Sequence, residues 1–314
     1  MMAFRIVIGD VTIGIQGQDF AYIFSVGMGG MESLYKDGKE WLYRAPRPAF
    51  WRAATDNDRG NGFVFRSAVW SAADRFVRCV KVAARMDEQE ISMPPAPENN
   101  KYNGDETCDR FEISYTYETP TVPVTEVTVS YLVESDGRIH VQVDYLGKQG
   151  LPELPVLGLR FLMPTAAEGY TYEGLSGETY PDRMAGGIHG VYEVQGLPVT
   201  PYMVPQDCGM HMQTKWLEIV RKTSLDNTDR GGRSSRLKIT AEEGKHFAFS
   251  CLPYTAQELE NAMHHEELPP ARRTVLSVLG AVRGVGGIDS WGADVEAPYH
   301  ISGEQNISYG FWIE

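Results

Sequence analysis

The sequence predicts an all-β protein built as one large antiparallel sandwich, with a few short helices. Three observations lead to this prediction. Apolar and polar residues alternate through many short segments, as they do in strands that bury one face. Glycine and proline, with 32 and 18 of the 314 residues, separate these segments at short intervals. The regular exchange of strand and helix patterns that indicates a parallel sheet does not occur.

Strands are expected where the alternation is most regular. The turn residues Ser135, Asp136 and Gly137 lie between two such segments and predict a hairpin. The strands expected from the pattern cover residues 4–16, 20–26, 111–117, 126–133, 138–145 and 306–313.

Two segments have apolar residues at helical spacing instead. Residues 67–77 place Trp70 and Phe76 on this period, and residues 256–267 do the same with Leu259. We therefore expect a helix in each segment. Neither segment is flanked by a linker long enough to mark a domain boundary, so the chain is expected to form a single domain over residues 1–314.

Composition limits the function classes. With 42% hydrophobic residues the chain can bury a large core, and its net charge of −13 disfavours nucleic acid or an anionic membrane as partner. No apolar run resembles a secretory signal or a membrane span, so a cytoplasmic protein is expected. No CxxC pair is present, which favours free thiols over disulfides or zinc ligands at Cys79, Cys108, Cys208 and Cys251.

Residues 50–62, with the sequence FWRAATDNDRGNG, form the most distinctive stretch of the chain. Glycine and Asx residues at this density are typical of a folded-back loop. Arginines flank Asp56, Asn57 and Asp58, so the loop is able to neutralise its own charges.

This stretch resembles the start of the C-terminal domain of the large β-galactosidases of glycoside hydrolase family 2, a region that some bacteria encode as a separate small subunit. Further segments resemble that domain in the same order, although Ala54, Tyr172 and Ser176 depart from its usual residues. The matching segments are LPVLGL at 154–159, YEGLSGETYPDR at 172–183, TPYMVPQDCG at 200–209 and GGIDSWG at 286–292.

The resemblance implies a fold, a partner and an activity. The fold would be a large two-sheet antiparallel supersandwich related to galactose mutarotase. The chain would be the small subunit of a heteromeric β-galactosidase that hydrolyses terminal β-D-galactosides such as lactose. The large subunit would carry both catalytic glutamates in a (β/α)8 barrel and a divalent cation, Mg²⁺, while this chain would hold no catalytic residue, cofactor or metal.

An independent catalytic centre would need a pair of carboxylates, because a retaining glycosidase uses two carboxyl groups about 5–5.5 Å apart. Asp56 with Asp58, and Glu178 with Asp182, are the candidate pairs. The first pair lies between arginines and Asp182 precedes Arg183, so ion pairing and backbone capping are the preferred interpretation of both. The resemblance places both catalytic glutamates in a separate barrel, and no barrel pattern occurs in this sequence, so the chain alone is expected to lack hydrolytic activity.

Trp291 is the main candidate for sugar binding. Its neighbours Asp289 and Ser290 and the surrounding glycines predict an exposed turn, held by Asx-type bonds, that presents the indole ring. An indole buries the apolar face of a sugar ring well. The alternative is that Trp291 packs between sheets. The resemblance favours the first reading, because the family's tryptophan at this position is a platform for the sugar at the active-site mouth.

Other candidates have weaker support. A structural or subunit-interface role is expected for Phe50, Trp51, Arg52, Asp56, Asn57, Asp58, Tyr180, Asp182 and Arg183. The core or a subunit interface is expected for Trp41, Trp51, Trp70, Trp216 and Trp312. Two other functions stay open: a stand-alone carbohydrate-binding module, and an aldose 1-epimerase using a base among His189, His211, His246, His264 and His300.

Overall fold

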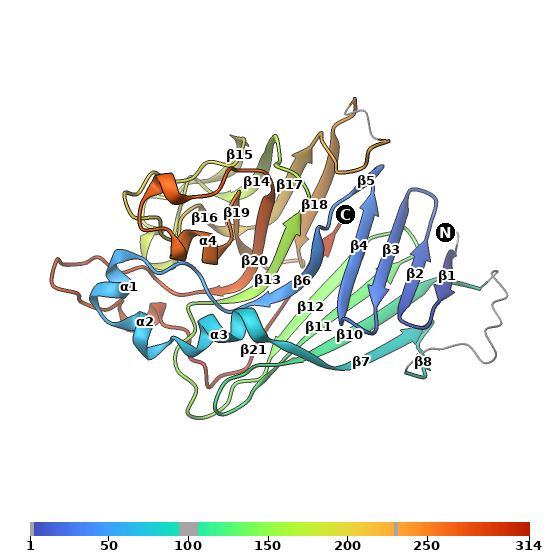
Figure 1. Cartoon of the computed structure of the whole chain (residues 1–314), viewed down its shortest axis with the longest axis horizontal. Coiled ribbons are helices and arrows are strands. Elements are labelled where there is room, and N and C mark those ends of the chain that lie inside the picture. Colours follow the sequence, from blue (N-terminus) through green and yellow to red (C-terminus); the bar gives the residue numbers. More distant parts are fainter. Residues whose placement is uncertain (1–2, 94–105, 229–231) are drawn as a thin grey trace.

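A ten-stranded antiparallel sheet forms one whole layer of the molecule (Figure 1). The computed structural model describes residues 3–93, 106–228 and 232–314. In spatial order the strands of the sheet are β15 (His189–Gln195), β14 (Gly169–Leu175), β17 (Trp216–Arg221), β18 (Ser235–Ala241), β21 (Ile307–Ile313), β12 (Ile139–Tyr145), β11 (Glu126–Glu134), β10 (Arg110–Glu118), β7 (Arg78–Met86) and β8 (Gln89–Ile91).

Two smaller antiparallel sheets form the opposite layer. The six-stranded sheet has the order β5 (Lys39–Glu40), β4 (Gly30–Lys36), β3 (Phe20–Ser25), β2 (Thr12–Gln16), β1 (Phe4–Ile8) and β9 (Thr107–Cys108). The five-stranded sheet has the order β16 (Met210–Thr214), β19 (Phe247–Leu252), β20 (Thr274–Val282), β13 (Val156–Met163) and β6 (Arg44–Ala49).

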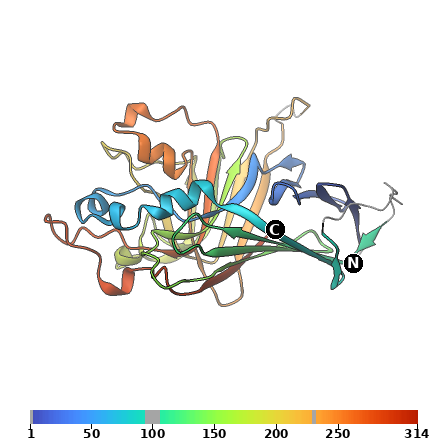
Figure 2. The ribbon, with the colours of Figure 1, turned by 60° about the horizontal axis from the view of Figure 1, so that its bottom comes forward.

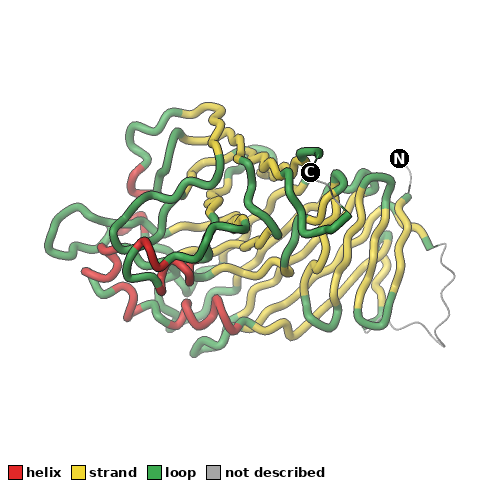
Figure 3. Tube along the Cα trace, turned by 45° about the horizontal axis from the view of Figure 1, so that its top comes forward, coloured by secondary structure: helices red, strands yellow, loops and turns green. Residues whose placement is uncertain are grey.

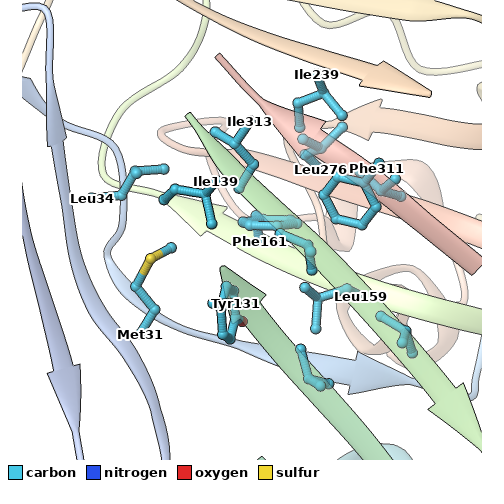
Figure 4. Packing of buried hydrophobic residues seen from close by; sticks show 14 of the residues in the cluster. Met31, Leu34, Tyr131, Ile139, Leu159, Phe161, Ile239, Leu276, Phe311 and Ile313 are labelled. Carbon is cyan, nitrogen blue, oxygen red and sulfur yellow. The ribbon is translucent and has the colours of Figure 1, made fainter. Parts of the chain in front are cut away.

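One continuous core joins the ten-stranded sheet to both smaller sheets (Figure 4). Phe24 of β3 lies 5.7 Å, between ring centroids, from Phe111 of β10 and from Tyr131 of β11. Phe161 of β13 makes an edge contact with Phe311 of β21 at 6.3 Å. Apolar side chains thus fill the space between two layers, which is the arrangement of a sandwich. The predicted all-β antiparallel fold is confirmed.

The strand predictions hold closely, with one correction. The expected hairpin turn lies between β11 and β12, where Gly137 has φ of +83° and the Glu134 N–H donates to the Arg138 carbonyl. Residues 4–16 were expected as one strand, and this was wrong. They form β1 and β2, because the chain turns at Gly9, whose N–H donates to the Thr12 carbonyl oxygen at 2.7 Å.

The helices are short and lie at the end of the sandwich away from the N-terminus (Figures 2 and 3). The helix expected at 67–77 corresponds to α3. The helix expected at 256–267 corresponds to α4 but ends early, because Ala262 is buried and extended and separates α4 from a single 3-10 turn. The helices and 3-10 turns are α1 (Asp56–Gly60), α2 (Phe63–Arg66), α3 (Val69–Phe76), α4 (Ala256–Asn261), η2 (Pro181–Arg183), η3 (His265–Glu267) and η4 (Ala297–Tyr299).

The stretch at 50–62 was expected as a loop, and the structure corrects this. Thr55 and Asp58 form a capping box: the Thr55 hydroxyl accepts from the Asp58 N–H at 3.1 Å, and Asp58 Oδ2 accepts from the Thr55 N–H at 3.0 Å. This reciprocal capping satisfies two backbone donors and starts α1 at Asp56.

Candidate functional site

Trp291 projects from the loop that follows β20, which we call the Trp291 loop (residues 283–295). The side chain of Trp291 is 89% exposed. Asp289 Oδ1 accepts hydrogen bonds from the N–H groups of Trp291, at 2.9 Å, and Ala293, at 3.1 Å. These bonds lower the pKa of Asp289, Ala293 making the largest contribution. The Asp289 carboxylate therefore stays ionised and holds the turn that presents the indole.

Three side chains from other parts of the fold fix the start of the Trp291 loop. Asp182, in η2, accepts from the N–H of Val285 at 3.0 Å and of Gly286 at 2.8 Å. Arg183 donates to the Gly286 carbonyl oxygen. Asn57, in α1, donates from Nδ2 to the Val285 carbonyl oxygen at 2.9 Å. Asp182, for which ion pairing and backbone capping were expected, thus binds the backbone of the loop that carries Trp291.

Arg283 anchors the loop in the interior. Its side chain is fully buried, and its guanidinium lies 3.9 Å from the centre of the Phe63 ring. Nη1 lies 3.3 Å from Asp58 Oδ1, Nε lies 3.3 Å from Glu153 Oε2, and Nη2 donates to Asp294. A buried guanidinium is tolerated only when paired in this way. Arg283 therefore ties both ends of the Trp291 loop to the fold.

Asp294 fixes the far end of the loop. Besides Arg283, its carboxylate accepts from Val295 N at 2.8 Å and Asn61 Nδ2 at 3.2 Å, and pairs with Arg66 at 2.6 Å. Burial alone would raise the pKa of Asp294, but the Val295 hydrogen bond and the charge of Arg283 lower it overall. The ionised form is the one that stabilises the loop.

The backbone of the Trp291 loop also lies close to the backbone of α1. Gly292 has φ of +85°, and a Cβ added to it would lie 2.9 Å from the carbonyl oxygen of Gly60 in α1. Only glycine fits this conformation and spacing without strain. The loop next to Trp291 therefore rests directly on α1.

The other residues of the 50–62 stretch have internal roles. Phe50 stacks on Trp70 with ring centroids 5.6 Å apart, and Trp51 is buried. Asp74 accepts from the N–H groups of both Phe50 and Trp51. Arg52 is buried and pairs with Asp58 at 2.8 Å. These contacts stabilise the platform on which α1 and the Trp291 loop lie.

Neither candidate carboxylate pair is arranged as a catalytic centre. Asp58 is buried between two arginines, and Asp56 is largely exposed and faces Arg59. Glu178 accepts from the Thr200 hydroxyl at 2.6 Å, while both oxygens of Asp182 bind backbone N–H groups. Ion pairing and backbone capping occupy Asp56, Asp58 and Asp182, as expected, whereas Glu178 binds a hydroxyl group.

Tyr180 and Asp207 form a buried pair close to Arg52. The Tyr180 hydroxyl donates to Asp207 Oδ2 at 2.9 Å. Burial raises the pKa of Asp207 to about 6, although the charge of Arg52 opposes the shift. His211 is also buried, with Nε2 3.0 Å from the Tyr170 hydroxyl, and burial lowers its pKa to about 4. His211 has no exposed face to offer a sugar.

Neither a metal-binding cluster nor a membrane-spanning helix occurs in the part of the chain that the structure describes. Within residues 3–93, 106–228 and 232–314, no group of three or more histidine, cysteine, aspartate or glutamate side chains is placed to hold a metal ion. No helix of the described residues has the length and apolar character needed to cross a bilayer.

Sequence reasoning missed Arg283, Asp294, Phe63 and Glu153. One feature of the sequence could have indicated Arg283: it follows the apolar strand β20 directly. An arginine there requires acidic partners at the end of the sheet. Its partner Asp58 is 225 residues away in the sequence, and no local pattern connects the two.

Comparison with known proteins identifies the family. The sequence profile of the beta galactosidase small chain family matches residues 16–313. The β-galactosidase small subunit of Latilactobacillus sakei is 58% identical, with 98% of this chain and 96% of that protein covered. The β-galactosidase of Streptococcus thermophilus is 33% identical over 99% of this chain, which spans 27% of that relative. The solved structure of a galactose mutarotase-like protein from Lactobacillus casei aligns with 96% of this chain and with 99% of its own chain. The sequence identity is 11% and the TM-score is 0.43, so this similarity says nothing about the site. The chain belongs to the beta galactosidase small chain family.

Proposed function

We propose that this chain is the small subunit of a heteromeric β-galactosidase that hydrolyses terminal β-D-galactosides such as lactose. The relative from Latilactobacillus sakei carries the name of such a subunit and matches along nearly its whole length. In the relative from Streptococcus thermophilus the matching region fills 27% of a longer β-galactosidase. The remaining length of that relative corresponds in this proposal to a separate large subunit.

The exposed indole of Trp291 is the observation that carries the proposal. Tryptophan is highly buried on average, yet Trp291 is 89% exposed on a loop that is itself held by buried charges. A ligand or a partner that covers this ring removes apolar surface from water, which favours binding. The C–H face of a galactose ring, bound at the mouth of the partner's active site, provides such a cover.

In this proposal the two subunits contribute different parts of the active site. The large subunit supplies the nucleophile, the acid/base and the divalent cation, and this chain completes the pocket with Trp291. The carboxylates around the Trp291 loop support this division, because Asp58, Asp182 and Asp294 are all committed to arginines or backbone N–H groups. A hydrolytic centre would need carboxylates that are available to the substrate.

Reconstitution tests the proposal. Lactose hydrolysis is measured for this chain alone, for the large subunit alone, and for both mixed in equal amounts. The expected result is activity in the mixture far above the sum of the separate chains, together with co-elution in size-exclusion chromatography. Hydrolysis by this chain alone, or a mixture no more active than the large subunit, would overturn the proposal.

A further inference from the structure

The outer face of the ten-stranded sheet carries a row of aromatic side chains. Residues in register across four neighbouring strands are Trp216 of β17, Thr240 of β18, Trp312 of β21 and His140 of β12. Figure 1 labels these four strands. Neighbouring strands are about 4.8 Å apart, so the two tryptophans are separated by about 10 Å. The row crosses the middle of the sheet on the side away from the core.

The structure separates Trp216 and Trp312 from the three other tryptophans for which the core or a subunit interface was expected. Trp41, Trp51 and Trp70 are buried as predicted, whereas Trp216 and Trp312 are only half-buried and face outward. Among the described residues, both rings are covered by their neighbours on the outer sheet face. Of the two expected locations the core therefore does not apply to them, and a subunit interface stays a prediction.

Side chains around the two rings hold them in place. Trp216 donates from Nε1 to Glu173 at 2.9 Å, and the Lys238 ammonium lies 5.5 Å from its ring centre. Trp312 lies between the ring of His140, at 4.8 Å, and the Arg138 guanidinium, at 5.1 Å. Lys238 and Arg138 are long, exposed side chains in weak surface contacts, and a ligand can displace them from the rings.

Hydrogen-bonding groups gather beside Trp312. Gly310 faces outward two residues before it, and a Cβ there would lie 2.7 Å from Glu242 Oε1 and 2.8 Å from Gln142 Oε1. These two oxygens cover the buried backbone of Gly310, and Glu242 Oε1 also lies 2.9 Å from His140 Nε2. Glycine inside a strand often marks a place where another group approaches the backbone closely. Hydrogen bonds from Lys245 and His140 lower the pKa of Glu242, so its carboxylate is ionised.

A groove continues from the same residues. It has a volume of about 740 Å³ and runs over β12, β11, β10 and β7. His140, Gln142 and Asp144 line one side, and Glu112 and Arg85 lie across it. The outer face is therefore hollowed beside the aromatic row, and the hollow is lined by amide, carboxylate and guanidinium groups that pair with hydroxyls.

We propose that this outer face binds a neutral oligosaccharide, with Trp216 and Trp312 as two platforms for sugar rings and with Glu242, Gln142 and Asp144 accepting hydroxyl hydrogen bonds. Flat aromatic rings beside a few polar groups are the chemistry that recognises sugars. The separation of the rings exceeds the width of one hexose, which selects an oligosaccharide over a monosaccharide. The site is independent of the Trp291 loop and of the proposed hydrolytic function.

Calorimetric titration of the purified full chain tests this site. The probe is a linear β-linked galactotetraose, compared with galactose. We expect saturable binding of the tetraose, about tenfold or more tighter than that of galactose, and a loss of about tenfold in Trp216→Ala and in Trp312→Ala. Phe65→Ala is the matched control, since it removes an aromatic ring that is 84% exposed on α2, and it should bind the tetraose like the unaltered chain.

A further variant tests the site without altering a tryptophan. Gln142→Ala removes a surface amide without removing a ring, so it should weaken binding several-fold even if a tryptophan variant fails to fold. Absence of saturable tetraose binding, or unchanged binding in Trp216→Ala, Trp312→Ala and Gln142→Ala, would overturn the proposal. Loss of binding in Trp291→Ala would also overturn it, by assigning the sugar to the Trp291 loop. Failure of lactose hydrolysis in the reconstituted complex would leave this result unaffected.

Discussion

Replacing Asp294 with asparagine should loosen the Trp291 loop and leave the sandwich intact. Asparagine has nearly the same shape and keeps one oxygen for the Val295 and Asn61 hydrogen bonds. What it removes is the negative charge opposite the buried Arg283. Arg283 then relies on Asp58 and Glu153 alone.

The structure sets the size of this effect. Removing one partner of a buried ion pair can cost about 3–5 kcal/mol, whereas a hydrogen bond to a charged group contributes about 1.5–3 kcal/mol. The Asp294 side chain is 33% exposed, and two other carboxylates still face Arg283, so the lower range applies. We expect a loss of about 2 kcal/mol in the free energy of unfolding. For 314 residues, with an unfolding entropy of about 2.1 cal/mol/K per residue, the melting temperature should fall by about 3 °C.

Urea denaturation and thermal unfolding of the purified chain measure this change. Arg66→Ala is the control, because Arg66 is 51% exposed in its pair with Asp294 and its loss should cost less than about 1 kcal/mol. If Asp294→Asn destabilises no more than Arg66→Ala, the ion pair with Arg283 does not hold the loop.

The pH dependence gives a second check on the same variant. The folded-state pKa of Asp294 lies below its unfolded value of about 3.9, so the ionised carboxylate stabilises the fold above that pH. The difference in stability between the unaltered chain and Asp294→Asn should therefore be complete above about pH 4 and shrink as the pH falls through the folded pKa. A difference that grows on acidification would refute this explanation.

Three further predictions concern the surroundings of the site. Gly292→Ala should cost about 1–3 kcal/mol in thermal unfolding, because φ of +85° and the nearby Gly60 carbonyl both oppose a Cβ; an unchanged melting temperature would contradict this. Thr55→Ala should cost about 1 kcal/mol in urea denaturation by removing the cap of α1, whereas Thr55→Ser should cost little, and equal losses would argue against capping. Burial raises the folded pKa of Asp207 to about 6, so the unaltered chain should lose about 3 kcal/mol of stability as the pH rises from 4 through 6. Asp207→Asn should lack this dependence, and parallel pH profiles of the two proteins would refute it.

Much of the fold could be predicted because each sheet has one buried face. In residues 111–117 and 138–145 the apolar side chains occur at every second position, and the structure buries those positions in β10 and β12. The same rule could have excluded the core from the two locations expected for Trp216 and Trp312. Leu217 and Phe311 face the core, so their immediate neighbours must face outward.

The candidate site was less predictable because its contacts join distant parts of the chain. The Thr55–Asp58 capping box was readable in the sequence, yet the density of glycine and Asx residues suggested a loop. The exposed turn at Trp291 followed from local residues, Asp289 above all. Its attachment to Arg283 depends on tertiary packing, which no spacing of residues along the chain reveals.

The steady-state kinetics of the reconstituted complex with Trp291→Ala test the central claim most directly. A tryptophan side chain buries about 150–250 Å² when fully covered, and covering roughly half of it with a sugar at about 25 cal/mol per Å² stabilises the complex by about 2 kcal/mol. We therefore predict that kcat/KM for lactose falls about 30-fold, while the subunits still co-elute and Trp291→Phe keeps an intermediate activity. A variant complex with unchanged kcat and KM would contradict the claim that this ring forms part of the galactoside pocket.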